Sequence, residues 1–332
     1  MTGNHFISVI IPTRNRSSLL EKALKSLLSQ TLSSDEFEVI VVDNGSTDTT
    51  SSVVESFFSL LPLRYFFDPT PGLHVGRHRG LAEAQGEILV YADDDIEALP
   101  TWLSSIQEAF TDRTVAMVGG NNFPLFLAPP PDWLKQLWQN SHDRQIRSLP
   151  WLSILEVQGG IQEWSPYQIW GCNFSIRKSV LLEAQGFHPD GMPKDLIRFR
   201  GDGESHVSRF VVESGMKALF HPGASVYHKV TPERMTYDYF RQRGFNQGVS
   251  DSYTQLRAKS ISTLPRPLSA YRIMRSVWSK LRSLGSRIRK RDDIPRALVE
   301  YKAGYREGFA YHQDTYRTDP EVREWVHRAT YY

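Results

Sequence analysis

The chain has 332 residues, 40% of them hydrophobic and 23% charged, which is the composition of a folded globular protein and not of a disordered or fibrous one. A formal net charge of +2 provides no general attraction to nucleic acid, so we expect no nucleic-acid partner. The single cysteine, Cys172, excludes an internal disulfide, and without a signal-peptide pattern or an apolar run of roughly 18 residues we expect a cytoplasmic protein that does not span a membrane.

Strand and helix patterns alternate over the first 120 residues. Short β-branched and aromatic runs predict strands, and apolar residues at helical spacing predict the helices between them. The expected strands are 6–11, 37–42, 64–67, 87–92 and 115–118. Four helices are expected: one that starts near residue 18, one that ends near 58, one over 72–85, and one that starts near 100. Such alternation predicts right-handed βαβ crossovers and a mostly parallel central sheet flanked by helices.

The following part of the chain is less regular. Residues 133–164 are rich in Trp, Gln and Ser and have weak periodicity, so we interpret them as an insertion that could form a lid or an acceptor wall. Regular patterns then return, and they predict a strand at 174–176, helices at 178–185 and 205–214, and an edge strand at 218–220.

The chain changes character near residue 250, so we divide it into an α/β domain, 1–250, and a helical, basic C-terminal extension, 251–332. Residues 271–291 contain eight cations and no acid, and their apolar residues, including Trp278, share one helical stripe. Two interpretations stay open. This helix could make peripheral contact with an anionic membrane, or it could pack on the preceding domain with a solvated basic face.

Three aspartates, Asp93, Asp94 and Asp95, directly follow the expected strand 87–92. Like charges at the end of a buried strand are unfavourable unless a positive group meets them. A divalent cation is the simplest candidate, because hard cations prefer carboxylate oxygens and because ligands of α/β sheets bind at the carboxyl ends of strands. The alternative is a solvated acidic turn.

Four further motifs accompany the aspartates. They are Pro12-Thr13-Arg14-Asn15-Arg16 and 41–48 after the first two strands, the Gly-rich basic stretch 71–80, and 170–177 followed by Gly201-Asp202-Gly203-Glu204. In this order and spacing, over roughly residues 6–230, they resemble the inverting family 2 glycosyltransferases of the GT-A fold. The resemblance implies transfer of a sugar from a nucleotide-diphosphate sugar, UDP- or GDP-linked, to a hydroxyl of a glycan or lipid-linked acceptor in polysaccharide or glycoconjugate assembly.

The resemblance also implies a donor site at the carboxyl ends of the first strands. Asp43 would accept a hydrogen bond from the base, Arg77 would neutralise the diphosphate or face the aspartates, and Trp170 would stack on the sugar. Taken alone, these three could instead be a turn cap, a surface ion pair and core packing. His78 departs from the family, which commonly has Asn there. The implied donor-binding residues are Pro12, Thr13, Arg14, Asp43, Arg77, Asp93, Asp94, Trp170, Gly171 and Asn173.

For the metal, the resemblance implies that Asp93 and Asp95 are the DxD pair that binds Mn²⁺ or Mg²⁺. His228 follows a short expected strand and could supply a nitrogen ligand to the same metal. The cation would stabilise the charge that develops on the departing diphosphate. Three consecutive acids also permit a shift by one residue, so Asp94 could take the metal role, and a lone His is more often only hydrogen-bonded. Arg234 follows His228 closely and could contact the acceptor, on position alone.

Inversion by direct displacement also requires a base for the acceptor hydroxyl. Counting back from Gly215, the expected helix end, gives Glu204 as the base, whereas counting back from Arg209 leaves Asp202 beside the base position. We prefer Glu204. Either carboxylate could instead only cap the helix that follows.

Two other functions remain as alternatives. A sugar nucleotidyltransferase needs a Gly-rich, basic loop after the first strand, and residues 12–15 lack one. A non-catalytic nucleotide-sugar-binding protein on the same fold is less consistent with the intact set of acids, and only a measurement of activity separates it from an enzyme.

Overall fold

The structure is a computed structural model that describes residues 6–143, 145–260 and 296–332. Its main sheet has the strand order β11-β13-β6-β12-β4-β1-β2-β3. The first strands of the chain pair in parallel, whereas β12 runs antiparallel between β4 and β6. The strand bounds are β1 Ile7–Thr13, β2 Phe37–Asp43, β3 Leu63–Phe67, β4 Ile88–Ala92, β6 Val115–Gly119, β11 Gln162–Glu163, β12 Asn173–Arg177 and β13 Lys217–Phe220.

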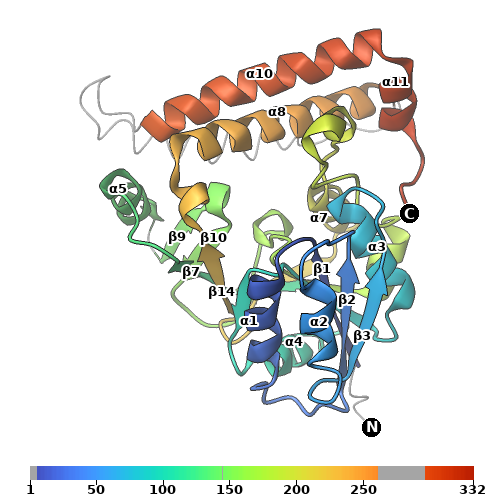
Figure 1. Ribbon diagram of the computed structural model, residues 1–332, viewed down its shortest axis with the longest axis vertical. Coiled ribbons are helices and arrows are strands. Elements are labelled where there is room, and N and C mark those ends of the chain that lie inside the picture. Colours follow the sequence, from blue (N-terminus) through green and yellow to red (C-terminus); the bar gives the residue numbers. More distant parts are fainter. Residues whose placement is uncertain (1–5, 144, 261–295) are drawn as a thin grey trace.

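Helices cover both faces of this sheet, as the alternating pattern predicted (Figure 1). Successive side chains of a strand point to opposite faces, so Val9 of β1 belongs to the hydrophobic cluster beneath α1, α2 and α4, and Ile10 to the cluster beneath α3, α6 and α7. The helix bounds are α1 Ser17–Leu27, α2 Thr50–Glu55, α3 Leu73–Glu83, α4 Trp102–Ala109, α6 Lys178–Glu183 and α7 Glu204–Glu213.

A second sheet, with the order β5-β14-β7-β10-β9-β8, lies beside the first. The segment 133–164, interpreted above as an insertion, supplies most of α5 and four strands, three of which belong to this sheet. The strand expected at 218–220 is present as β13, but the expectation that it forms an edge of the sheet was wrong, since β13 lies between β11 and β6. The additional bounds are β5 Ile96–Ala98, β7 Asn122–Phe126, α5 Asp132–Asn140, β8 His142–Asp143, β9 Ile146–Leu149, β10 Ile154–Val157, β14 Val226–Val230 and the 3₁₀ turns η1 Pro150–Leu152, η2 Pro166–Gln168, η3 Lys194–Phe199 and η4 Pro232–Met235.

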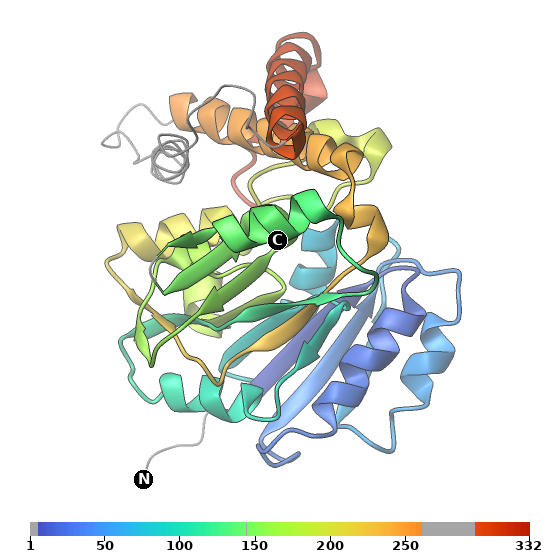
Figure 2. The same ribbon diagram turned by 90° about the vertical axis from the view of Figure 1, so that its left-hand side faces the viewer.

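Two long helices, α8 (Tyr237–Ser260) and α10 (Arg296–Thr318), lie side by side above the sheets, and α11 (Pro320–His327) follows them (Figures 1 and 2). The helical extension is therefore present, but the division drawn at residue 250 falls inside the unbroken helix α8. The basic stretch 271–291 lies outside the described residues. Among the helices that are described, none is both long and apolar enough to cross a membrane.

Glycines let α8 and α10 approach closely. A Cβ added at Gly304 of α10 would lie 2.0 Å from the backbone oxygen of Arg241 in α8, and Gly244, Gly248 and Gly308 are similarly confined. A side chain could move aside to make room for such a Cβ, but the nearest atoms at these glycines belong to the backbone of the facing helix and cannot.

We expect Gly304→Ala to lower the free energy of unfolding by about 1–3 kcal/mol, because overpacking outweighs the gain of up to about 1 kcal/mol in helix propensity. Denaturant unfolding would measure the change. Gly160→Ala is the matched control, since a Cβ at Gly160 meets nothing within 4 Å and should leave stability unchanged. Equal stability of both variants would contradict this account of the helix pair.

Candidate active site

Three strand ends place polar side chains at one edge of the main sheet. β1 and β2 are parallel and in register, with Thr13 opposite Asp43. β4 lies on the other side of β1 and is followed directly by Asp93, Asp94 and Asp95. The carboxyl ends of parallel strands meet at the same edge, so these side chains gather where ligands of α/β sheets bind.

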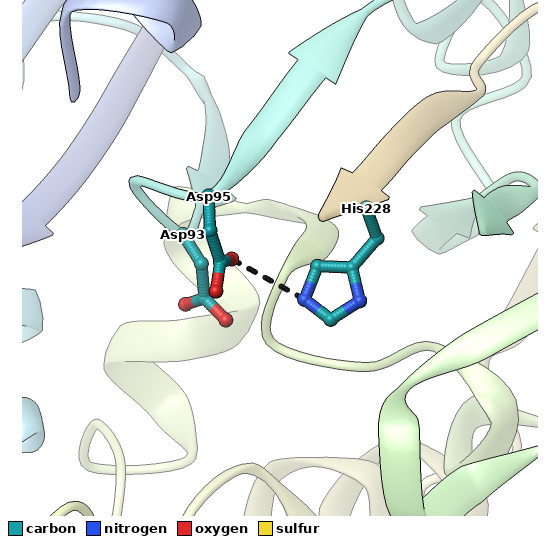
Figure 3. Close-up of side chains that lie close together, drawn as sticks. All are labelled: Asp93, Asp95 and His228. Atoms are coloured by element: carbon teal, nitrogen blue, oxygen red, sulfur yellow. Dashed lines mark ion pairs between the residues drawn. The ribbon is translucent and has the colours of Figure 1, made fainter. Parts of the chain in front are cut away.

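His228 reaches the same place from the second sheet. β14 pairs with β5 so that His228 is opposite Ile96, the residue after Asp95. Figure 3 shows the imidazole close to the carboxylates of Asp93 and Asp95. One potential ligand atom from each of the three residues lies within 4.8 Å of the other two. The structure thus brings together the three residues that were suggested as metal ligands.

These side chains fit a divalent cation in chemistry as well as in spacing. Oδ1 of Asp95 is buried, lies 3.2 Å from Nε2 of His228, and receives no hydrogen bond from the described residues. Burial and the charge of Asp95 raise the pKa of Asp93, a repulsion that a cation between the carboxylates would relieve. Burial also raises the pKa of Asp95, but His228 and Arg234 outweigh it and hold that pKa well below its usual range. The two carboxylates suit Mn²⁺ or Mg²⁺, and the imidazole favours a transition metal such as Mn²⁺ over Mg²⁺.

Asp94 is engaged differently from its two neighbours. Its Oδ2 accepts a hydrogen bond from Oγ1 of Thr13 at 2.7 Å, and its Oδ1 pairs with the guanidinium of Arg16 at 2.6 Å. Thr13 and Arg16 therefore fix Asp94 against the end of β1. With both oxygens occupied, Asp94 is a poorer candidate than Asp95 for the metal.

Arg77 joins the aspartates to the candidate base. Its side chain is 3% exposed, so burial excludes the interpretation as a surface ion pair. Its guanidinium lies 3.9 Å from Oδ1 of Asp93 and 3.3 Å from Oε2 of Glu204, and it stacks on the ring of Phe187. A Cβ at Gly171 would lie 2.1 Å from this guanidinium, so glycine is required there for Arg77 to occupy its position.

The contacts of the two candidate bases differ sharply. Asp202 has a 5% exposed side chain and accepts from His188 at 2.6 Å, from Arg209 at 2.5 Å and from Thr254 at 2.9 Å. Burial raises its pKa, but His188 and Arg209 hold that pKa well below its usual range. Glu204, the first residue of α7, is 26% exposed and contacts Arg77. The geometry therefore favours Glu204 as the candidate base. Asp202 instead has a structural role, because its contacts hold the loop before α7 in place.

His78 connects α3 to the C-terminal segment. Its Nε2 accepts a hydrogen bond from the backbone N–H of Phe187 at 2.8 Å, so its Nδ1 carries the proton and donates to the backbone oxygen of Tyr331 at 3.1 Å. Burial lowers the pKa of His78 to about 3, which keeps the ring neutral. The ring of Tyr332 packs on the same imidazole. His78, where the family commonly has Asn, thus links α3 to the C-terminal segment at the position next to Arg77.

Asn173 and Trp170, suggested as donor-binding residues, have structural partners. The Asn173 amide is buried, accepts from Nε1 of Trp102 at 2.9 Å and donates to the backbone oxygen of Ala224 at 3.0 Å. Trp170 is partly buried against two hydrophobic clusters. These contacts give Asn173 a structural role, and its suggested part in the donor site stays a prediction.

We expect Asn173→Ala to lower the free energy of unfolding by about 1–3 kcal/mol, because Nε1 of Trp102 would be buried without its acceptor. Donor affinity of the folded variant should match that of the parent. Unfolding curves and ligand titration of the same preparation would measure the two quantities. A loss of affinity at unchanged stability would restore the donor role of Asn173.

The remaining donor candidates lie at the ends of β1 and β2. Asp43 is buried, accepts from the backbone N–H of Ser46 at 2.7 Å, and accepts from the hydroxyl of Tyr65 at 2.8 Å, so it caps its own turn. Pro12 is buried and Arg14 is exposed beside it. The contacts of Asp43 are compatible with a role beside a base, because each carboxylate oxygen has a second lone pair.

Two arginines matter more than the motifs indicated. Arg16 pairs with both Asp94 and Asp95, although it was noted only as the last residue of a motif. Arg234 was suggested for the acceptor, but its guanidinium lies 3.3 Å from Oδ2 of Asp95. The sequence did contain a signal for Arg16. It is a cation just after the first strand, at the edge of the sheet where the three aspartates were expected.

The geometry defines an acidic site at the strand ends of an α/β sheet, with three side chains placed to hold a metal ion, and sequence comparison gives the family. Residues 8–181, more than half of the chain, match the family described as "Glycosyl transferase family 2". The chain belongs to this family. It is 38% identical over 114 residues to validoxylamine A glucosyltransferase of Streptomyces hygroscopicus subsp. jinggangensis (strain 5008), a match that covers 34% of this chain and 27% of that enzyme. The matched part is thus about a quarter of this relative's length.

A second relative matches along more of the chain. Glucosyl-dolichyl phosphate glucuronosyltransferase of Haloferax volcanii is 23% identical over 257 residues, which is 74% of this chain and 75% of that protein. Among solved structures, the mannosyltransferase PcManGT from Pyrobaculum calidifontis, in complex with GDP-Man and Mn²⁺, superposes with a TM-score of 0.55 at 21% identity, over 98% of this chain and 86% of that one. The likeness confirms the expected GT-A fold class.

Proposed function

We propose that this protein is a metal-dependent, inverting glycosyltransferase that moves a sugar from a nucleotide-diphosphate sugar to an acceptor hydroxyl. The observation that carries the proposal is the group Asp93, Asp95 and His228, joined through buried Arg77 to the partly exposed carboxylate of Glu204. A cation-binding group and a separate carboxylate are the two parts that displacement of a diphosphate requires. Membership of the family supports the same reaction class.

Each residue then has a distinct task. Asp93, Asp95 and His228 would hold the cation, and the bound cation supplies positive charge for the leaving diphosphate. Glu204 accepts the proton of the acceptor hydroxyl while the acceptor oxygen bonds to the anomeric carbon. The bond from that carbon to the diphosphate oxygen breaks, and its electron pair leaves with the nucleoside diphosphate. Arg77 orients Glu204 and adds a second positive charge beside Asp93.

The proposed donor is UDP- or GDP-linked, and the proposed acceptor is a glycan or a lipid-linked glycan. The structural neighbour PcManGT was solved with GDP-Man and Mn²⁺, and the name of the Haloferax volcanii relative specifies a dolichyl phosphate-linked substrate. Both proteins are distant in sequence, so they support the class of substrate and not its identity.

A thermal-shift screen of UDP- and GDP-sugars, each with and without Mn²⁺, would identify the donor, because a ligand that binds the folded state raises its melting temperature. The selected donor is then incubated with Mn²⁺ and a panel of acceptors, and release of the nucleoside diphosphate is measured. The sugar in the product is expected to have the inverted anomeric configuration. Tight binding without any turnover on an acceptor panel would favour the non-catalytic binding protein. Pyrophosphate release from a nucleoside triphosphate and a sugar phosphate would favour the nucleotidyltransferase.

A further inference from the structure

Arg234 lies among the atoms that would bind the metal. It belongs to η4, directly after the strand that carries His228. One of its guanidinium nitrogens, NH1, is 3.3 Å from Oδ2 of Asp95 and also 3.3 Å from Nε2 of His228. The Arg234 side chain is only 15% exposed, and that of Asp95 is 3% exposed. A fixed positive charge therefore already contacts two of the three candidate ligands.

The other contacts of Arg234 explain why it stays there. Its Nε donates to the hydroxyl of Tyr239 at 3.1 Å, and NH2 donates to the backbone oxygen of Leu152 at 3.2 Å. Its guanidinium also lies over the ring of Tyr239. Only NH1 contacts the candidate ligand atoms. A cation bound at Nε2 of His228 would therefore displace NH1, whereas the hydrogen bonds to Tyr239 and Leu152 could remain.

Charges within the site are nearly balanced without a metal. The carboxylates are Asp93, Asp94, Asp95 and Glu204, and the guanidiniums that pair with them are Arg16, Arg77 and Arg234. Four acids thus face three arginines among the described residues, which leaves little net negative charge for a lone divalent cation. A cation that arrives together with a diphosphate brings its own counter-charge, and the guanidinium of Arg234 then attracts the phosphates and no longer only repels the metal.

We propose that Arg234 is a resident counter-charge that makes metal and diphosphate bind together: it opposes Mn²⁺ alone and favours the Mn²⁺–diphosphate pair. The inference rests on the proposed function, since it takes Asp95 and His228 as metal ligands. Its physical content is a coupling free energy between two ligands, and such coupling is reciprocal, so Mn²⁺ must raise diphosphate affinity by the same factor as diphosphate raises Mn²⁺ affinity.

Calorimetric titration of the full chain tests this coupling without any turnover. Mn²⁺ alone, and Mn²⁺ with UDP or GDP, would be titrated into the parent, Arg234→Gln and Arg234→Lys. Because Gln removes the charge, Mn²⁺ alone should bind Arg234→Gln at least about tenfold more tightly, and the gain in Mn²⁺ affinity on adding the diphosphate should shrink by at least about tenfold. Arg234→Lys keeps the charge and should stay within about threefold of the parent in both quantities.

Melting temperatures of the three proteins show that each is folded before titration. The inference is overturned if Arg234→Gln binds Mn²⁺ alone no more tightly than the parent, or if Arg234→Lys gains as much as Arg234→Gln, since charge would then not be the cause. Failure of the proposed function looks different: the parent would bind no Mn²⁺ with either diphosphate present, and both ideas would fall together.

Discussion

Glu204→Gln is expected to lower kcat by about 10²–10⁴-fold with little change in donor affinity, because the amide keeps the shape of the side chain but cannot accept the acceptor proton. Glu204 is suited to this role by position. It begins α7, is partly exposed, and its only described ion pair is with Arg77, which also faces Asp93. The loss should therefore appear in turnover and not in binding of the nucleotide.

Asp202→Asn is the matched control for this prediction. Asp202 ties the loop before α7 to His188, to Arg209 and to Thr254 of α8, so removal of its charge should cost about 1–3 kcal/mol of stability. Turnover per folded molecule should fall less than in Glu204→Gln. Steady-state kinetics with donor titration and thermal unfolding would separate the effects. Full activity of Glu204→Gln beside an inactive, stably folded Asp202→Asn would reverse the two roles.

The strand ends were predictable because their signals are local. Apolar runs of strand length, each followed by polar turn residues, predicted β1, β2 and β4 closely, and parallel pairing then placed Thr13, Asp43 and the three aspartates at one edge. The choice of Glu204 also used a local signal, its distance from the glycine after α7. His228 was different. Its place after a short strand suggested a possible nitrogen ligand, but nothing local in the sequence pointed to the aspartates, and pairing of β14 with β5 brings it to them.

Contacts between distant parts of the chain could not be predicted in this way. The second sheet is assembled from short strands that come from separate parts of the chain, and such short strands carry weak periodicity. The contact of His78 with Tyr331 spans 253 positions. Asn173 follows a motif Trp and Gly, which suggested a sugar contact, but its partner Trp102 is 71 positions away. Residue type shows what a side chain can bind, and the tertiary fold decides which partner it meets.

Asp95→Asn is expected to abolish detectable Mn²⁺ binding in the presence of UDP or GDP and to lower turnover by at least about 10³-fold, roughly 4 kcal/mol of lost transition-state stabilisation. The amide is nearly isosteric with the carboxylate, so the packing around residue 95 should be kept. It cannot supply the anionic oxygen, and it leaves Arg16 and Arg234 with less opposing charge close to the cation site.

Asp94→Asn is the control that distinguishes the two possible registers of the triple aspartate. Because the Asp94 carboxylate is held by Thr13 and Arg16, this variant should lose stability but keep Mn²⁺ binding with the diphosphate. Titration of free Mn²⁺ by electron paramagnetic resonance, together with thermal unfolding, measures both. Retention of Mn²⁺ by Asp95→Asn and its loss in Asp94→Asn would move the ligand to Asp94, and the short Thr13 and Arg16 contacts would then have to break on metal binding.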